Sequence, residues 1–292
     1  MNKLKSYLWV AGVSVVMICM VVTAQVGGQE SIDPTSGGAG DNTTIDFVAP
    51  QVFQAAGPNI ASIQSSVTEF RNALGALNGN ALTELPNGRR EINWDGAVPT
   101  DATTPPVNPF NTFLNNRGAQ FTTPGIGLSQ APPSGGQQGG LATLFSNPTY
   151  ATSFKAFSPA RLFTSVGSNV TDTFFFVAGS NGTVRAGVTG FGAIFSDVDQ
   201  PDGSGPGAKR GNRGSSTLVQ FFGADGRLLY SSFVPASPGD GSFSFLGITF
   251  NDARIASVRI TAGDVAPGPN DDSANDIVMM DDFIYGEPHR LP

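Results

Sequence analysis

The sequence predicts an all-β protein: a jelly-roll-type antiparallel β-sandwich preceded by a short amphipathic helix. The 37 glycines and 21 prolines make up about a fifth of the 292 residues, against roughly 12% in average proteins, which indicates many turns and few long helices. Short apolar segments recur in the second half at roughly 8–12-residue spacing, as in sandwiches. The 22 phenylalanines can supply the core between two sheets.

The first 24 residues have the pattern of a secretory signal peptide. Two lysines precede an apolar run that ends at Val22, and small residues follow up to Ala24. We expect cleavage after Ala24, with a membrane span as the alternative, because the run approaches the minimum of about 17 residues. Residues 25–55 are rich in Gly, Ser, Asp and Thr, which predicts a disordered leader.

Cleavage would leave an acidic chain without cysteine. Lys3, Lys5 and Cys19 leave with the signal, so the basic residues fall from 16 to 14 against 23 acidic ones. An exported chain without disulfides needs a core, and we expect an ion, for its stability. The negative charge argues against nucleic-acid partners. We therefore expect a secreted protein, extracellular or periplasmic, and no stable membrane anchor, since no second apolar segment follows.

Residues 56–76 predict an amphipathic helix. Asn59 can cap its start, and Gly75 follows its last apolar position. We expect this helix to pack on the sheet domain, with a partner-binding helix as the alternative. Five apolar residues recur at steps of three and four and so share one helical face: Ile60, Ile63, Val67, Phe70 and Leu74.

Polar and apolar residues alternate with a period of two in residues 88–288, in place of the helical period. We expect the sandwich domain there. Asp225-Gly226 separates two apolar runs and predicts a hairpin. Within one strand Phe191 and Phe195 share a face, which we expect to point inward. The predicted strands are 91–95, 120–123, 173–177, 188–195, 218–222, 228–233, 243–250, 255–260 and 277–285.

Several enzyme classes are disfavoured. The only histidine is His289, close to the C-terminus, which argues against a Ser-His-Asp or Cys-His mechanism and against a multi-histidine zinc site. The chain has no Walker loop and no dinucleotide-binding fingerprint. Trp94 alternates with polar residues, and we expect it in the core and not in a sugar-binding platform.

The last predicted strand carries two adjacent carboxylates. Strand alternation places Asp281 on the face of Phe283, and Asp282 on the opposite face; both faces are otherwise apolar. A buried carboxylate is costly unless it is paired, hydrogen-bonded or bound to a metal. The alternatives are a calcium site, exposure at a strand end, or a salt bridge to one of three arginines: Arg90, Arg161 or Arg259.

This ending resembles the last strand of secreted bacterial jelly-roll proteins, among them carbohydrate-binding modules and the sandwich domains of exported proteins with a sorting tail. The segments Ile92-Asn93-Trp94-Asp95 and Gly118–Pro124 are similar to earlier strands of those proteins. The resemblance implies a polysaccharide or cell-surface ligand. It also implies a structural Ca²⁺ where the first and last strands meet, with these candidate ligands: Glu91, Asp95, Asp281 and Asp282.

Asp197 and Asp199 are secondary candidates for a calcium site. They begin an acidic, glycine-rich stretch that departs from EF-hand spacing. A solvated loop is the alternative.

Together these features predict an exported, non-catalytic sandwich protein, stabilised by calcium, with a binding or surface and matrix role. The alternative is an extracellular glycan-active enzyme that uses Asp and Glu. Glu91 and Asp95 would lie about 13 Å apart along one strand. That distance exceeds both carboxylate separations used in glycoside hydrolysis, so this pair does not favour the enzyme.

Overall fold

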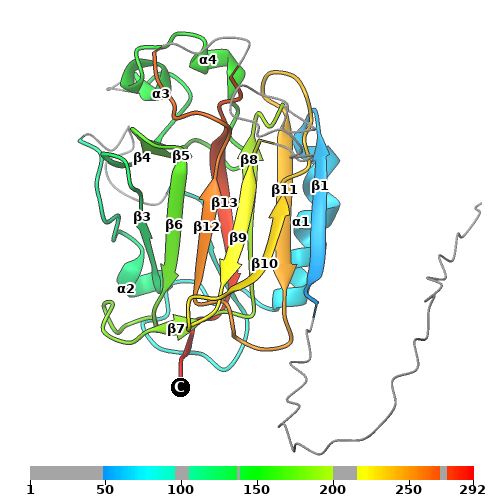
Figure 1. Ribbon diagram of the computed structural model, residues 1–292, viewed down its shortest axis with the longest axis vertical. Coiled ribbons are helices and arrows are strands. Elements are labelled where there is room, and N and C mark those ends of the chain that lie inside the picture. The colour runs from blue at the N-terminus through cyan, green and yellow to red at the C-terminus, as the bar shows by residue number, and fades with distance from the viewer. Residues whose placement is uncertain (1–48, 96–104, 137–138, 200–215, 270–274) are drawn as a thin grey trace, which may run out of the picture. The chain divides into compact units, whose positions relative to one another are not determined.

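The computed structural model describes residues 49–95, 105–136, 139–199, 216–269 and 275–292. The predicted signal peptide, 1–24, and the leader up to residue 48 lie outside the described residues. The described chain confirms the predicted all-β fold, since two antiparallel sheets pack face to face as a sandwich (Figure 1).

The first sheet, sheet A, has the order β1-β11-β8-β13-β5-β4, and β2 also pairs with β13. Its strands β8 and β11 have both faces covered, so apolar side chains lie on both sides of each of them. Its strands are β1 (Gln51–Gly57), β2 (Arg89–Ile92), β4 (Gly127–Ala131), β5 (Leu162–Val166), β8 (Gly190–Ser196), β11 (Phe243–Thr249) and β13 (Met279–Gly286).

The second sheet, sheet B, has the order β10-β9-β12-β6-β3. The Asp225-Gly226 turn joins β9 and β10, whose bounds match the predicted hairpin. Its strands are β3 (Ala119–Thr122), β6 (Val170–Phe175), β9 (Leu218–Phe222), β10 (Leu228–Phe233) and β12 (Ser257–Thr261). A short pair of β7 (Ala186–Gly187) and β14 (His289–Arg290) lies outside both sheets.

Phenylalanine fills the space between the sheets. Phe191 is fully buried and its ring lies 6.1 Å from that of Phe175 in sheet B and 5.2 Å from that of Phe283 in sheet A. The inward orientation predicted for the Phe191 face is therefore confirmed. Trp94 is also buried and stacks on Phe163 at 3.7 Å, so its predicted core position is confirmed too.

Helix α1 (Ile60–Leu74) packs on the outer face of sheet A beside β1 and β11 (Figure 1). Its buried residues are four of the five predicted ones, while Ile60 in the first turn is 39% exposed. Asn59 is the N-cap, and its side chain accepts a hydrogen bond from the Ser62 amide at 3.2 Å. The helix therefore forms a third layer, and its expected packing on the sheet is confirmed.

The predicted leader is wrong at its C-terminal end. Residues 51–55 belong to β1, which pairs along its whole length with β11. The sequence QVFQAAG does not alternate apolar and polar residues, so strand periodicity does not reveal this edge strand. The prediction also missed β4, β5, the two short strands β7 and β14, and three short helices, α2 (Leu114–Arg117), α3 (Gly140–Leu144) and α4 (Tyr150–Ser153).

Among the described residues, no helix is both long enough and apolar enough to cross a membrane.

Candidate functional site

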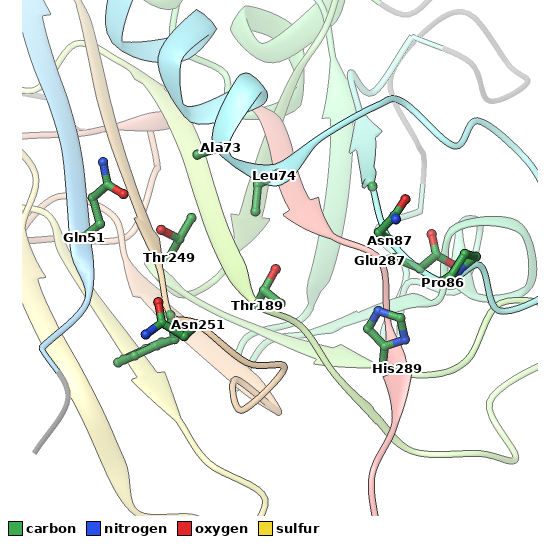
Figure 2. Close-up of a pocket in the computed structure, with 12 residues that line it drawn as sticks. Gln51, Ala73, Leu74, Pro86, Asn87, Thr189, Thr249, Asn251, Glu287 and His289 are labelled. Carbon is green, nitrogen blue, oxygen red and sulfur yellow. The ribbon is translucent and has the colours of Figure 1, made fainter. Parts of the chain in front are cut away.

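A pocket of about 460 Å³ opens where helix α1 ends beside sheet A. Figure 2 shows Gln51, Thr249 and Asn251 on one side, Asn87 and His289 on the other, and Thr189 between them. These residues come from β1, the end of β11, the loop before β2, the start of β8 and β14. The volume falls within the range of roughly 300–1,000 Å³ that is usual for small-ligand sites.

The lining of this pocket is polar but mostly uncharged. Within the described part of the chain, five lining side chains make no hydrogen bond to the protein. Leu74 and Phe250 add apolar surface. The pocket can therefore offer both donors and acceptors to a ligand without rearranging internal bonds. The five side chains are Gln51, Asn87, Thr189, Thr249 and Asn251.

Glu287 is the carboxylate among the lining residues, and its oxygens are fully used. Arg90 donates to both oxygens, at 2.7 and 2.6 Å, and both side chains are completely buried. Asn78 Nδ2 and the Leu85 amide donate to the same carboxylate, at 2.8 and 3.2 Å. A carboxylate with four donors has no lone pair left for a substrate proton, so Glu287 is a structural group.

Arg90 also organises the pocket wall. Its remaining N–H groups donate to backbone carbonyls of Ala81 at 2.9 Å, Thr83 at 3.1 Å and Asn116 at 2.8 Å. The five donors of the guanidinium are thereby satisfied inside the protein. These hydrogen bonds hold the loop that ends in Asn87 in one position. The pocket is therefore largely preformed.

Asp281 and Asp282 lie elsewhere, at a β-bulge in β13. From Met280 to Phe283 three steps along β13 match two steps along β8, from Phe195 to Ala193. The extra residue breaks the alternation, so the predicted placement of the two carboxylates on opposite faces is wrong. Ser158 Oγ lies 3.2 Å from Asp281 Oδ1 and 2.7 Å from Asp282 Oδ1, which shows that both side chains meet at one place.

Arginine supplies the positive charge at this place. Arg71 of α1 donates to both oxygens of Glu91, at 3.0 and 2.8 Å, and to Asp282 at 3.3 Å. Arg89 donates to Glu91 at 2.6 Å. We call this group the carboxylate cluster: Glu91, Asp281 and Asp282 with Arg71, Arg89 and Ser158.

The salt-bridge partners named from the sequence are therefore wrong. Arg90 pairs with Glu287 and Arg259 with Asp172, while Arg161 donates to the Asp95 carbonyl. The sequence does not single out Arg71, because this residue reaches Asp282 from a helix that lies 211 positions away along the chain.

Burial governs the protonation of the cluster. Desolvation, and then the charge of Asp282, raise the pKa of Asp281 well above its usual range, although the Phe157 amide donates to it at 2.6 Å. Desolvation also raises the pKa of Asp282, which the hydrogen bond from Ser158 and the charge of Arg71 oppose. A proton on Asp281 thus relieves repulsion within the pair.

The four predicted calcium ligands do not converge. Glu91, Asp281 and Asp282 share the cluster, but Asp95 accepts from the amides of Ala160 and Arg161, at 2.7 and 3.0 Å. Among the described residues, no three His, Cys, Asp or Glu side chains form a group that could hold a metal. Calcium binding at this place stays a prediction of the sequence, and an arrangement already neutralised by arginine does not favour it.

The secondary candidates lie at the end of β8. Asp197 is 8% exposed, and its Oδ1 has no partner among the described residues. Desolvation, then the charges of Asp199, Asp240 and Asp276, raise the pKa of Asp197 to about 8. Asp199 instead accepts from the Gly239 amide at 2.7 Å. Asp197 is therefore mostly protonated at neutral pH.

Comparisons with protein-family models, with curated proteins and with solved structures found no match for the chain. Function is therefore inferred from the geometry of the pocket and of the carboxylate cluster.

Proposed function

We propose that the protein is an exported, non-catalytic binding protein whose pocket takes a neutral sugar, as a free saccharide or as part of a polysaccharide or cell-surface glycan. The supporting observation is the set of five uncharged side chains that line the pocket and make no internal hydrogen bond in the described chain. Hydrogen-bonding groups at an opening that the protein itself does not use are paired with water, which a ligand can replace.

The chemistry of the lining favours polyhydroxyl ligands. A sugar hydroxyl both donates and accepts, and the amides of Asn87 and Asn251 and the hydroxyls of Thr189 and Thr249 can match either role. The partly apolar floor at Leu74 suits the C–H face of a sugar ring. A phosphorylated ligand would instead need arginine or lysine in the lining.

A binding role is better supported than the glycan-active enzyme considered from the sequence. Such an enzyme needs two accessible carboxyl groups, one as a general acid and the other as a base or a nucleophile. Glu287 is saturated by its donors, and Asp281 and Asp282 are almost fully buried in a cluster outside the pocket.

Export rests on the signal-peptide pattern of the first 24 residues. We expect the mature chain to begin at Gln25, and mass spectrometry of the protein from the culture medium or periplasm checks this. Retention of residues 1–24 in the exported protein would contradict it.

The experiment for the binding role is an array of neutral oligosaccharides, with the same compounds then incubated with the protein and examined for cleavage. We expect binding without hydrolysis. Turnover that a single carboxylate substitution abolishes would support the enzyme instead, and a protein that binds no neutral glycan would overturn the proposal.

A further inference from the structure

The single histidine of the chain lies in the pocket wall. His289 stands on β14, and Figure 2 shows its ring on the side of the pocket that Asn87 and Glu287 also line. Its Nδ1 lies 3.1 Å from Oε1 of Glu84. Its Nε2 has no hydrogen-bond partner among the described residues. One ring nitrogen is therefore held by the protein while the other is unused.

The contact with Glu84 selects one tautomer. An ionised carboxylate can only accept hydrogen bonds, so Nδ1 must carry the proton. In the neutral ring Nε2 is then a bare acceptor. The backbone amide of Arg290 also donates to Glu84 Oε1, at 3.3 Å, which holds the carboxylate in place.

The other charged groups near the ring do not compete for it. Glu287, in the link between β13 and β14, is committed to Arg90, Asn78 and the Leu85 amide. Arg290 follows His289 on β14 and is exposed, and the opposing strand β7 presents Ala186 and Gly187. Glu84 is therefore the charged group that sets the ring's proton position.

We propose that His289 is a ligand-contacting residue that accepts a hydrogen bond through Nε2 from a hydroxyl of the sugar, with Glu84 as the residue that positions it. This inference rests on the proposed sugar-binding function of the same pocket. The inference adds a requirement on the ligand. The five other polar side chains can adapt to a donor or an acceptor, whereas Nε2 of the neutral imidazole requires a hydrogen-bond donor.

The first test uses the lone histidine as its own probe. A long-range ¹H–¹⁵N spectrum of the full chain contains one native imidazole, so its tautomer can be assigned without ambiguity. We expect the neutral ring in its Nδ1–H form, and a mixture of tautomers in Glu84→Ala. A dominant Nε2–H form in the native protein would overturn the inference.

The second test titrates the protein with the methyl glycosides of glucose, galactose, mannose and N-acetylglucosamine. A bound glycoside should shift the Nε2 resonance of His289. His289→Phe should weaken binding about 2- to 10-fold, the range expected for one hydrogen bond. His289→Gln, which keeps an acceptor oxygen on the side chain, should recover part of the loss.

The outcomes separate this inference from the function on which it rests. A glycoside or array glycan that binds equally well to native protein and His289→Phe overturns the role of His289 and leaves the sugar-binding function intact. If no glycoside and no array glycan binds, the proposed function fails and the role of His289 fails with it. Melting curves of each variant exclude loss of folding as the cause.

Discussion

The pocket and the carboxylate cluster both border the last turns of helix α1, but they differ in whether their polar side chains are hydrogen-bonded within the protein. Arg71 reaches the cluster, where the three carboxylates are held by arginine, hydroxyl or amide donors. Ala73 and Leu74, two and three positions later, line a pocket whose amides and hydroxyls are unpaired in the described chain.

This difference distinguishes polar residues that stabilise the fold from polar residues that can bind a ligand. A polar group that is buried must find its partner within the protein, since an unpaired one costs free energy. A polar group at an opening has water as its partner, and a ligand can replace that water. Substitutions in the buried group should therefore change stability, and those in the pocket should change binding.

The largest effect is expected at Arg90. Arg90→Ala removes one member of a fully buried ion pair and should lower the free energy of unfolding by about 3–5 kcal/mol. Denaturant unfolding measures the loss. Arg90→Lys keeps the charge but not the two parallel hydrogen bonds to Glu287, so its stability should lie between those of the native protein and Arg90→Ala. An unchanged unfolding curve for Arg90→Ala would mean that the loop before β2 does not depend on this pair.

Arg71 comes next. Arg71→Met keeps much of the side-chain volume but leaves Asp282 and Glu91 with fewer donors, and should destabilise the protein by about 1.5–3 kcal/mol. The matched control is Arg227→Met, whose ion pair with Asp225 is exposed and should matter by less than about 0.5 kcal/mol. Equal unfolding curves for the two variants would remove the distinction drawn for the cluster.

Asp197 tests the cost of a buried carboxylate beside which the described residues place no cation. Burial raises its pKa to about 8, so its contribution to stability is present below the ordinary pKa of 3.8 and is lost as the pH rises toward 8. Asp197→Asn should therefore stabilise the protein at pH 8 by on the order of 1 kcal/mol and change little at pH 4. Its left-handed backbone, φ 73°, suits Asn.

Thermal melting at pH 4, 6 and 8 measures that difference between native protein and Asp197→Asn. A gain that is the same at every pH would contradict titration of Asp197 as its cause.

The smallest effect is expected for calcium. A bound ion would stabilise the fold by about 2.7 kcal/mol at a hundredfold excess over its dissociation constant. Because arginine already pairs with Glu91 and Asp282, and burial favours the protonated form of Asp281, we expect the same melting temperature in millimolar Ca²⁺ and in chelator. A calcium-dependent rise that Asp281→Asn or Asp282→Asn abolishes would restore the site predicted from the sequence.

The features that depend only on the sequence of a single chain segment were predictable. Helix α1 follows from apolar residues at helical spacing with Asn59 and Gly75 at its ends, and the hairpin at Asp225 follows from its turn dipeptide. Such signals depend on neighbours in sequence, so they need no knowledge of tertiary contacts. The inward face of Phe191 was predictable for the same reason.

The two sites were not predictable in this way. The bulge at Asp281 and Asp282 is a mismatch between two strands, and alternation within one strand cannot reveal it. The pocket joins Gln51, Asn87, Thr189 and Asn251, which come from separate elements. One signal is present in the sequence, the lone His289, but a single histidine near the C-terminus indicates which mechanisms are disfavoured and not where its ring lies in the fold.

The most direct test of the separation between binding and stability is a calorimetric titration of four proteins with the neutral glycan that binds best on the array. Thr249→Val removes a pocket hydroxyl, and Thr261→Val makes the same change at a half-buried strand position outside the pocket. Asp281→Asn alters the cluster, and native protein is the reference. We predict at least about a threefold loss of affinity in Thr249→Val alone, with its melting unchanged. Equal affinities for Thr249→Val and Thr261→Val would contradict the account.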